Sequence, residues 1–393
     1  MKFNDFDNMD RGFLDEVIYP GKTPEDRARN EALLQGYDYP KYCEELTGYA
    51  GQDRQRVEFV RRSAARRVRV GPVGNYKAGM ALHPQGFLLV AACRPVYGPN
   101  GPYDVTFHIY VYRSDDMGLS WTEINRTDLL GKEPSMVCLP DGTVVLTAQH
   151  IENNAQSPEM PVYRSLDGGV TWETNLLPGN RDYPRNLLMD RDGSIVFIRS
   201  WEFRYEFETD KPFASPNLEI CRSRDGGCTW SRTEGKVDWD YTGIMEVSTA
   251  ILDDGRMLAS LRRQPPGTKG EGFEDTVLTE SLDGGLTWGA PRRVSETGEV
   301  HFNLLKLRDG RVMASYSNYH VPYGVCAILS QDCGRAWDHD SIVQLAHSHD
   351  YYTGWPVTVE LPDGSLITSY AITSHYEQKP ASTSCEVVRW AME

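Results

Sequence analysis

Short apolar stretches alternate along most of this chain with tight turns rich in aspartate and glycine. In Leu139–Leu146 and Leu361–Thr368, for example, Leu-Pro-Asp-Gly leads directly into a run of mostly apolar or β-branched residues. Asp-Gly between two apolar runs favours a two-residue β-hairpin turn, in which both central residues adopt positive φ. The chain therefore predicts six hairpins, with turns at Gln85-Gly86, Asp141-Gly142, Asp192-Gly193, Asp254-Gly255, Asp309-Gly310 and Asp363-Gly364.

A second pattern, Ser-x-Asp-x-Gly-x-x-Trp, follows five of these hairpins, and we call its copies the repeat turns. They recur about every 50 to 60 residues, a spacing that favours one sheet per repeat and hence a β-propeller. In the fifth copy Ala336 replaces the usual hydroxyl residue, which should loosen that turn. The five copies are Ser114–Trp121, Ser165–Trp172, Ser223–Trp230, Ser281–Trp288 and Ser330–Trp337.

Six hairpins and five repeat turns predict an all-β fold, a six-bladed β-propeller over residues 57–393. The sixth blade lacks a repeat turn because the chain ends after one more strand. Its outermost strand should therefore come from Val57–Val73, so that strands near the two termini pair and close the ring. Residues 1–56 are expected to form a partly helical extension, with helices near 23–36 and 40–46.

Composition narrows the function classes. A net charge of −15 argues against nucleic-acid and anionic-membrane partners. Neither a signal peptide nor a membrane span is visible, and the eight cysteines form no compact framework, so we expect reduced thiols and a cytoplasmic protein. No HExxH or phosphate-binding loop appears, which predicts neither metal nor cofactor. Whether the chain forms homo-oligomers is left open.

A ligand site on the propeller axis would be built from the starts of first strands and the ends of second strands. These positions are rich in charged and aromatic residues, which suggests a polar ligand site, although a water-filled channel lining remains an alternative. From them we predict substrate contacts by Lys77, Arg94, Glu133, Arg185, Trp201, Arg262, His320 and Trp355. The remaining positions are Tyr76, Gln149, His150, Asn186, Arg199, Glu246, Arg263, His301, Asn303, Tyr319 and Tyr370.

The repeat turns match the Asp-box (BNR) repeat, and over about residues 70–392 the chain resembles the six-bladed propellers of the sialidase superfamily. This resemblance implies that Glu246 matches the glutamate that polarises the catalytic nucleophile in those enzymes. It also implies that Arg262 matches one of three arginines that clamp a substrate carboxylate, and that Asp104 matches the acid/base aspartate. The alternative roles are surface ion pairs for Glu246 and Arg262 and a loop turn for Asp104.

The chain also departs from that family pattern. Tyr76-Lys77 stands where the first-blade arginine is expected, and blade five carries no arginine at the third clamp position. Trp355 stands where the nucleophilic tyrosine is expected, and an indole is not a nucleophile. Tyr352 lies close enough in sequence to substitute if the strand starts elsewhere.

The catalytic candidates are therefore Asp104, Glu246, Tyr352 and His349. Hydrolysis without a tyrosine would use Asp104 or Glu133 as the acid and Glu246 as a base that activates water. Histidine is a further candidate base, because several histidines fall near the same predicted loops: His150, His301, His320, His347 and His349.

The resulting prediction is a sialidase-like glycoside hydrolase that releases a terminal sugar, with an acidic sugar favoured, from oligosaccharides or glycoconjugates. Two alternatives remain: a polysaccharide lyase that acts on uronate-containing glycans, and a glycan-binding propeller without catalytic activity. In all three cases the expected partner is a carbohydrate.

Overall fold

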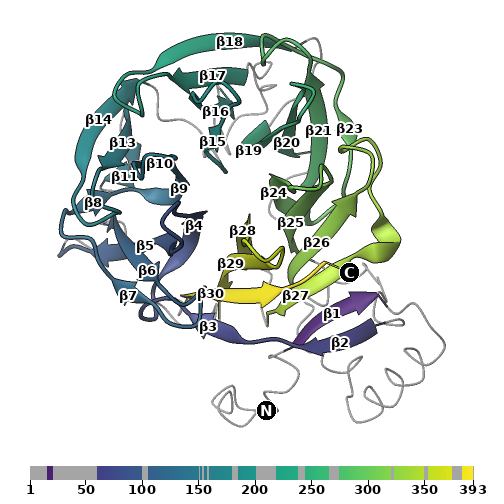
Figure 1. The fold of residues 1–393 in the computed structure, drawn as a ribbon, viewed down its shortest axis with the longest axis horizontal. Helices are drawn as coiled ribbons and strands as arrows, with labels where there is room; N and C mark the ends of the chain where they lie inside the picture. The colour runs from purple at the N-terminus through teal and green to yellow at the C-terminus, as the bar shows by residue number, and fades with distance from the viewer. Residues whose placement is uncertain are drawn as a thin grey trace.

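A computed structural model of the chain describes residues 16–20, 60–99, 105–149, 151–152, 155–156, 159–178, 185–200, 218–237, 244–264, 274–319, 323–348, 353–373 and 383–392. These residues form six antiparallel blades around a central axis, so the predicted six-bladed propeller is confirmed (Figure 1). The helices predicted near 23–36 and 40–46 lie outside the described residues.

In each blade consecutive strands run outwards from an innermost strand at the axis, and in blades five and six the outermost strands come from the N-terminal part of the chain (Figure 1). The first three blades consist of β4 (Tyr76–Leu82), β5 (Leu88–Tyr97), β6 (Val105–Ser114), β7 (Thr122–Glu123) and β8 (Leu129–Leu130); β9 (Lys132–Cys138), β10 (Val144–Gln149), β13 (Glu159–Ser165) and β14 (Glu173–Pro178); and β15 (Leu188–Met189), β16 (Ile195–Ser200), β17 (Leu218–Ser223) and β18 (Ser231–Val237).

The other three blades repeat this order, and β22 (Thr287–Trp288), which lies between β21 and β23 in the chain, pairs in parallel with β18 and so joins the sheet of blade three. They consist of β19 (Ile244–Ile251), β20 (Met257–Arg263), β21 (Asp275–Ser281) and β23 (Arg292–Arg293); β24 (Glu299–Lys306), β25 (Val312–Asn318), β26 (Gly324–Ser330) and β27 (Val343–His347); and β28 (Gly354–Glu360), β29 (Leu366–Thr373), β30 (Thr383–Trp390) and β3 (Arg67–Arg69).

Strands from the N-terminal part of the chain complete two blades. In blade six, β3 pairs with β30, with Arg67 opposite Val388, so a segment that precedes blade one supplies the outermost strand. In blade five, β1 (Glu16–Pro20) pairs with β27, and β2 (Val60–Ala64) pairs with β1. Part of the extension predicted for residues 1–56 thus adds a strand to a propeller blade, while the boundary at residue 57 stays a prediction.

Among the described residues, the remaining elements are a short β-ribbon and one helical turn. Their bounds are β11 (Ile151–Glu152), β12 (Ala155–Gln156) and the 3₁₀ turn η3 (His339–Ser341).

The six predicted hairpin turns are present, but their geometry differs from the expectation. In the Leu139–Gly142 turn only the glycine takes positive φ, 90° at Gly142. Gly142 N donates to Leu139 O (2.9 Å), and Asp141 Oδ1 accepts a hydrogen bond from Thr143 N (2.9 Å). The prediction of a two-residue turn with both central residues at positive φ is therefore wrong. A type I turn followed by a left-handed glycine forms instead, because the aspartate side chain caps it.

Apolar residues fill the spaces between blades, and neighbouring residues on one strand serve different interfaces. On β10, Val144, Leu146 and Ala148 pack towards blade one, whereas Val145 packs with Phe197 and Leu187 of blade three. Successive side chains on a strand point to opposite faces, so this division follows from the strand geometry. The same alternation decides which neighbouring blade the side chain of the last residue of each second strand faces.

The repeat turns lie at the rim, between the third strand of a blade and the strand that follows it. In the fourth copy Ser281 Oγ donates to Asp283 Oδ1 (2.8 Å), and Thr287 donates to the same carboxylate through its amide (2.8 Å) and hydroxyl (2.6 Å). In the fifth copy Asp332 keeps the amide bond, from Ala336 (2.7 Å), and has no corresponding hydroxyl. The loss expected from the sequence of the fifth copy is thus one hydrogen bond.

Candidate active site at the central axis

A β-bulge recurs near the start of the innermost strand in five of the six blades. In blade one Tyr76 pairs with Cys93 and Gly79 with Ala91, so β4 carries one more residue than β5 between these pairs. The extra residue forces a left-handed backbone, which is unusual for residues other than glycine and costs roughly 1–3 kcal/mol. The left-handed residues are Lys77 (φ 49°), Glu133 (54°), Glu246 (54°), His301 (58°) and Trp355 (48°).

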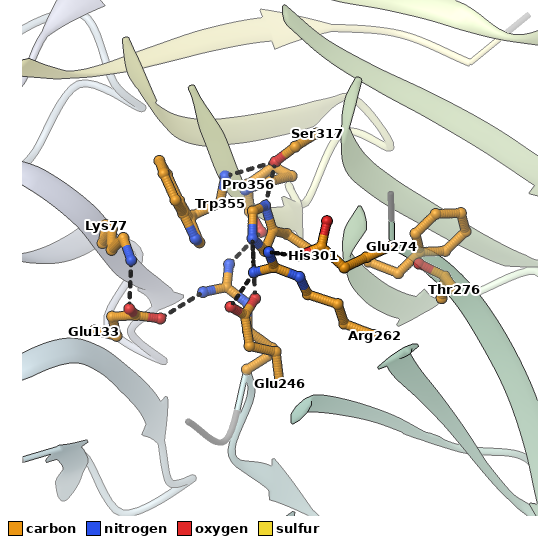
Figure 2. A network of polar contacts seen from close by, with 12 residues as sticks. Lys77, Glu133, Glu246, Arg262, Glu274, Thr276, His301, Ser317, Trp355 and Pro356 are labelled. Atoms are coloured by element: carbon orange, nitrogen blue, oxygen red, sulfur yellow. Dashed lines mark hydrogen bonds and ion pairs between the residues drawn. The ribbon is translucent and has the colours of Figure 1, made fainter. Parts of the chain in front are cut away.

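The bulge turns these side chains towards the axis, where they meet in one buried polar network (Figure 2). Blade three contributes Arg185, which precedes β15, in place of a bulge residue. Strain of this kind persists where the surrounding structure fixes it, and it is concentrated at functional sites. The network is the strongest candidate for a functional site among the described residues.

One half of the network surrounds Glu246. Arg262 Nη1 donates to Glu246 Oε1 (2.9 Å), and Arg262 Nη2 donates to Glu274 Oε1 (2.7 Å). His301 Nε2 lies 3.2 Å from Glu246 Oε2 and 2.9 Å from Arg262 Nη1. Arg262 is thus held between two carboxylates of its own chain, and its fork fixes the position of Glu246.

Electrostatics sets the charge of Glu246 and His301. Burial alone would raise the pKa of Glu246, but the contacts with His301 and Arg262 outweigh it and hold that pKa well below the ordinary value. Burial lowers the pKa of His301 to about 3, despite the neighbouring Glu246 carboxylate. At neutral pH the site therefore contains an ionised Glu246 beside a neutral imidazole.

The His301 ring is fixed at both nitrogens. Its Nδ1 lies 2.8 Å from Ser317 Oγ, and that oxygen also accepts a hydrogen bond from Trp355 N (3.0 Å). The backbone at the start of blade six is thereby connected through Ser317 to the imidazole and on to Glu246. A neutral histidine held in this way positions its neighbours and does not supply a proton at pH 7.

The other half of the network surrounds Glu133. Lys77 Nζ donates to Glu133 Oε1 (2.5 Å), and Arg185 Nη1 lies 3.7 Å from Glu133 Oε2. The Trp355 ring joins the two halves: Lys77 Nζ lies 4.2 Å from the centre of the ring, and the His301 ring lies 4.8 Å away. In Figure 2 the indole stands between Lys77 and His301. An aromatic ring beside an ammonium group is a favourable cation–π contact.

The structure brings together six of the residues proposed from the sequence and places one elsewhere. Arg94 is directed away from the network, because its Nε donates to Asn75 Oδ1 (2.9 Å) and its guanidinium lies 3.9 Å from the centre of the Tyr110 ring. Five candidates lie outside the described residues: Asp104, Trp201, His320, His349 and Tyr352. The six that meet are Lys77, Glu133, Arg185, Glu246, Arg262 and Trp355.

Three further residues complete the network, His301, Ser317 and Glu274, and the sequence placed only His301 of these among the axial positions. His301 was one histidine among several candidates, and only its position beside Glu246 distinguishes it. Ser317 and Glu274 carry no motif, and their contacts depend on the bulges and on the start of β21. For Ser317, the only sequence signal towards the axis was its position near the end of a predicted second strand.

Two further features bear on the kind of site in the described part of the chain. No group of three or more His, Cys, Asp or Glu side chains there is arranged to hold a metal ion. No helix among the same residues has the length and apolar character that a membrane span requires.

The fold and the axial network define a class: a six-bladed propeller with a buried polar centre. No family model matches the chain. A sialidase of Micromonospora viridifaciens is 25% identical over 256 residues, which cover 58% of this chain but only 37% of that protein. The resemblance to sialidases predicted from the sequence is thus confirmed, while the chain matches little more than a third of that relative's length.

Solved structures confirm the fold. A protein of unknown function from Dyadobacter fermentans matches with a TM-score of 0.64 and 18% identity, over 82% of this chain and 98% of that one. The NanB sialidase of Streptococcus pneumoniae matches with a TM-score of 0.58 and 13% identity, over 81% and 68% of the two chains. A Fusarium graminearum α-L-arabinofuranosidase matches with a TM-score of 0.59 and 17% identity, over 83% and 97%.

Proposed function

We propose that the protein is a glycoside hydrolase that removes a terminal sugar at the propeller axis. The observation that carries this proposal is the buried Glu246 carboxylate, which is held ionised and hydrogen-bonded by Arg262. It lies where the bulges of five blades direct their side chains to one point. Its resemblance to a sialidase and to arabinofuranosidase propellers supports the same reaction class. Glycoside hydrolysis requires a fixed carboxylate near the anomeric carbon and a proton donor for the leaving oxygen.

The roles follow from the contacts of each carboxyl group. Glu246, with its lowered pKa, acts as the ionised carboxylate that stabilises positive charge on the sugar ring or activates water. Glu133 Oε1 already accepts a hydrogen bond from Lys77, so we assign proton donation to Asp104, which lies outside the described residues. Arg262 and His301 serve as positioning residues for Glu246.

The charge balance of the network bears on the sugar. Lys77, Arg185 and Arg262 are matched in formal charge by Glu133, Glu246 and Glu274, and all six side chains are buried. A sugar carboxylate placed here would add a negative charge that these residues leave unbalanced. This balance favours a neutral sugar. An acidic sugar, favoured by the sialidase resemblance, is the second candidate and would require a cation beyond these six, such as Lys132, whose Nζ lies 3.8 Å from Glu133 Oε1.

The alternatives predict different products. A lyase needs a base that removes a proton beside a uronate, and a pKa of about 3 makes His301 a poor base. Elimination would create an unsaturated product with new ultraviolet absorbance. A glycan-binding propeller would retain its ligand unchanged.

A panel of 4-methylumbelliferyl glycosides tests the proposal. It includes the α-N-acetylneuraminide as the acidic arm, the α-L-arabinofuranoside as the neutral arm, and common pyranosides. We expect turnover of at least one substrate, and loss of that turnover in Glu246→Gln. The matched control is Glu219→Gln, which removes the carboxylate of another buried ion pair, with Arg199 at 2.6 Å, and should keep activity.

Binding of sugars without release of the fluorophore from any substrate would contradict the hydrolase proposal and leave the glycan-binding alternative. A new ultraviolet-absorbing product from a uronate-containing polysaccharide would establish the lyase instead. Equal loss of activity in Glu246→Gln and Glu219→Gln would show that Glu246 acts through stability alone.

A further inference from the structure

Beside Glu133, several buried polar atoms have no hydrogen-bond partner. The atoms without a partner are the oxygen and the nitrogen of the Gln149 amide, the Thr147 hydroxyl oxygen, Glu133 Oε2 and Arg185 Nε. Gln149 and Thr147 are fully buried, and Glu133 and Arg185 are only 4% and 6% exposed. Buried polar groups in folded proteins are almost always hydrogen-bonded, so a concentration of exceptions requires an explanation.

Strand geometry directs these groups to one place. The extra residue of the blade-two bulge lies on β9, so β10 is regular and Val145, Thr147 and Gln149 share one face. Val145 packs against blade three, and Gln149 therefore faces blade three at the axial end of the strand. Gln149 is also directly opposite Lys132, the residue before Glu133, and Arg185 reaches towards Glu133 from blade three.

Two other blades carry a polar residue at the equivalent position, whereas blades one and six carry Cys93 and Ala371 there. Arg262 and Ser317 occupy the same place relative to the bulge on the second strands of blades four and five. Each contacts the axial residue of the next blade, Arg262 with His301 at 2.9 Å and Ser317 with the Trp355 amide at 3.0 Å. Gln149 alone among the three makes no such bond, although its amide has both donors and an acceptor.

We propose that Gln149 and Thr147, together with Glu133 Oε2 and Arg185 Nε, form the subsite that binds hydroxyl groups of the terminal sugar. The Gln149 amide, the Thr147 hydroxyl and the Arg185 guanidinium can each donate a hydrogen bond. The Gln149 and Thr147 oxygens and the Glu133 carboxylate can each accept one. A sugar hydroxyl donates and accepts at once, so two adjacent hydroxyls match the set. The gap of 3.7 Å between Glu133 Oε2 and Arg185 Nη1 is too long for a direct hydrogen bond and suits a shared ligand atom. This inference rests on the proposed function.

The test replaces the amide with an apolar side chain of similar length, Gln149→Met. Binding of L-arabinose, D-galactose and N-acetylneuraminic acid is measured by calorimetry beside the unfolding temperature. We expect affinity for the bound sugar to fall by about 10- to 100-fold, because a site built for hydroxyls loses its partners. The unfolding temperature should stay the same or rise, since an unpaired buried amide is removed.

Asn303→Leu is the matched control. Asn303 is also a buried amide, but its Oδ1 accepts a hydrogen bond from Thr358 N (3.1 Å). This variant should unfold at a lower temperature and keep the affinity of the wild type for sugar. Thr147→Val provides a second, smaller test of the subsite, with weaker sugar binding at unchanged stability.

The outcomes separate the subsite from the proposed reaction. A Gln149→Met protein that binds sugar as tightly as the wild type would overturn the subsite, and turnover by the wild type would then leave the hydrolase proposal intact. Sugar binding that depends on Gln149, with no turnover of any glycoside, would support the subsite and contradict the hydrolase. If the wild type binds none of the three sugars, the subsite is overturned.

Discussion

The repeat turns at the rim and the bulges at the axis are both copied from blade to blade, yet the residues they use differ. At the rim each copy has an exposed aspartate at the same position, and its carboxylate accepts hydrogen bonds from its own turn, as Asp283 does from Ser281 and Thr287. At the axis the same backbone shape carries four kinds of side chain in five blades: lysine, glutamate in two blades, histidine and tryptophan. A repeated structure with repeated residues indicates a folding role, whereas a repeated structure with varied residues indicates a site.

The largest expected effect comes from the axis. Glu246→Gln should lower kcat/KM by about 100- to 10,000-fold, because the ionised carboxylate is lost while the shape of the side chain is kept. Steady-state kinetics on the best substrate of the glycoside panel measures this change. An activity loss below tenfold would remove Glu246 from the proposed mechanism and blur the distinction between axis and rim.

The next effect is a dependence of stability on pH that originates at His301. Below its ordinary pKa of about 6.5 an unfolded histidine binds a proton, whereas folded His301, with a pKa of about 3, does not. The unfolded state therefore binds more protons, and stability falls as the pH decreases from about 6.5 to 4.5. The slope from one such group approaches 1.4 kcal/mol per pH unit.

Denaturant unfolding of wild type and His301→Gln across this range measures that slope. The variant should have a flatter profile between pH 6.5 and 4.5, even if it is less stable overall. Parallel profiles for the two proteins would show that His301 titrates normally and that the site is more open to water than its burial indicates.

A smaller effect is expected at the rim. Asp283→Asn should lower the free energy of unfolding by about 1–2 kcal/mol and leave turnover unchanged, because the asparagine accepts fewer of the turn's hydrogen bonds. Hydrogen bonds from the Thr287 hydroxyl and amide lower the pKa of Asp283 to about 2. The wild-type contribution is therefore present above about pH 4 and is lost as the pH falls towards 2.

Asp332→Asn serves as the matched comparison, since Asp332 keeps the hydroxyl of Ser330 as a partner but lacks a second hydroxyl donor, because Ala336 stands at that position. Its effect on unfolding should be smaller than that of Asp283→Asn. A larger effect at Asp332, or a loss of activity in either variant, would contradict a purely structural role for the rim.

The smallest effect is expected from Gly284→Ala. Gly284 has a φ of +73°, and a Cβ added there would meet no atom within 4 Å, so the cost is backbone strain alone. We expect a loss of about 1 kcal/mol in the free energy of unfolding, with unchanged kinetics. Met117 and Cys333 hold the equivalent left-handed position in two other copies, which shows that the turn tolerates a side chain. Thermal unfolding measures the difference.

The sequence was sufficient to predict the blades because their signals are local. Asp-Gly turns and repeat turns depend on a few neighbouring residues, and counting them gave six blades. The same counting placed Glu246, Arg262 and Trp355 at the axis, where they lie in the structure. The turn geometry was predicted wrongly because the hydrogen bond that Thr143 N donates to Asp141 Oδ1 competes with the two-residue form.

The contacts between the site residues could not be predicted from the sequence, for a physical reason. Lysine, glutamate and tryptophan rarely adopt a left-handed backbone, so nothing local predicts the bulges at four of these five positions. Without the bulges, the contacts from His301 to Glu246 and Ser317 do not follow. Arg94 was misplaced because it lies one residue past Cys93, and the alternation of the strand turns it away, towards Asn75 and Tyr110.

The most direct test of the axial site is a crystal structure of Glu246→Gln soaked with the sugar that the wild type releases. We predict sugar density on the axis, with its hydroxyls at Gln149 and Arg185 and its anomeric carbon facing residue 246. Sugar bound only at the rim, or an axis that stays free of sugar at saturating concentration, would contradict the account.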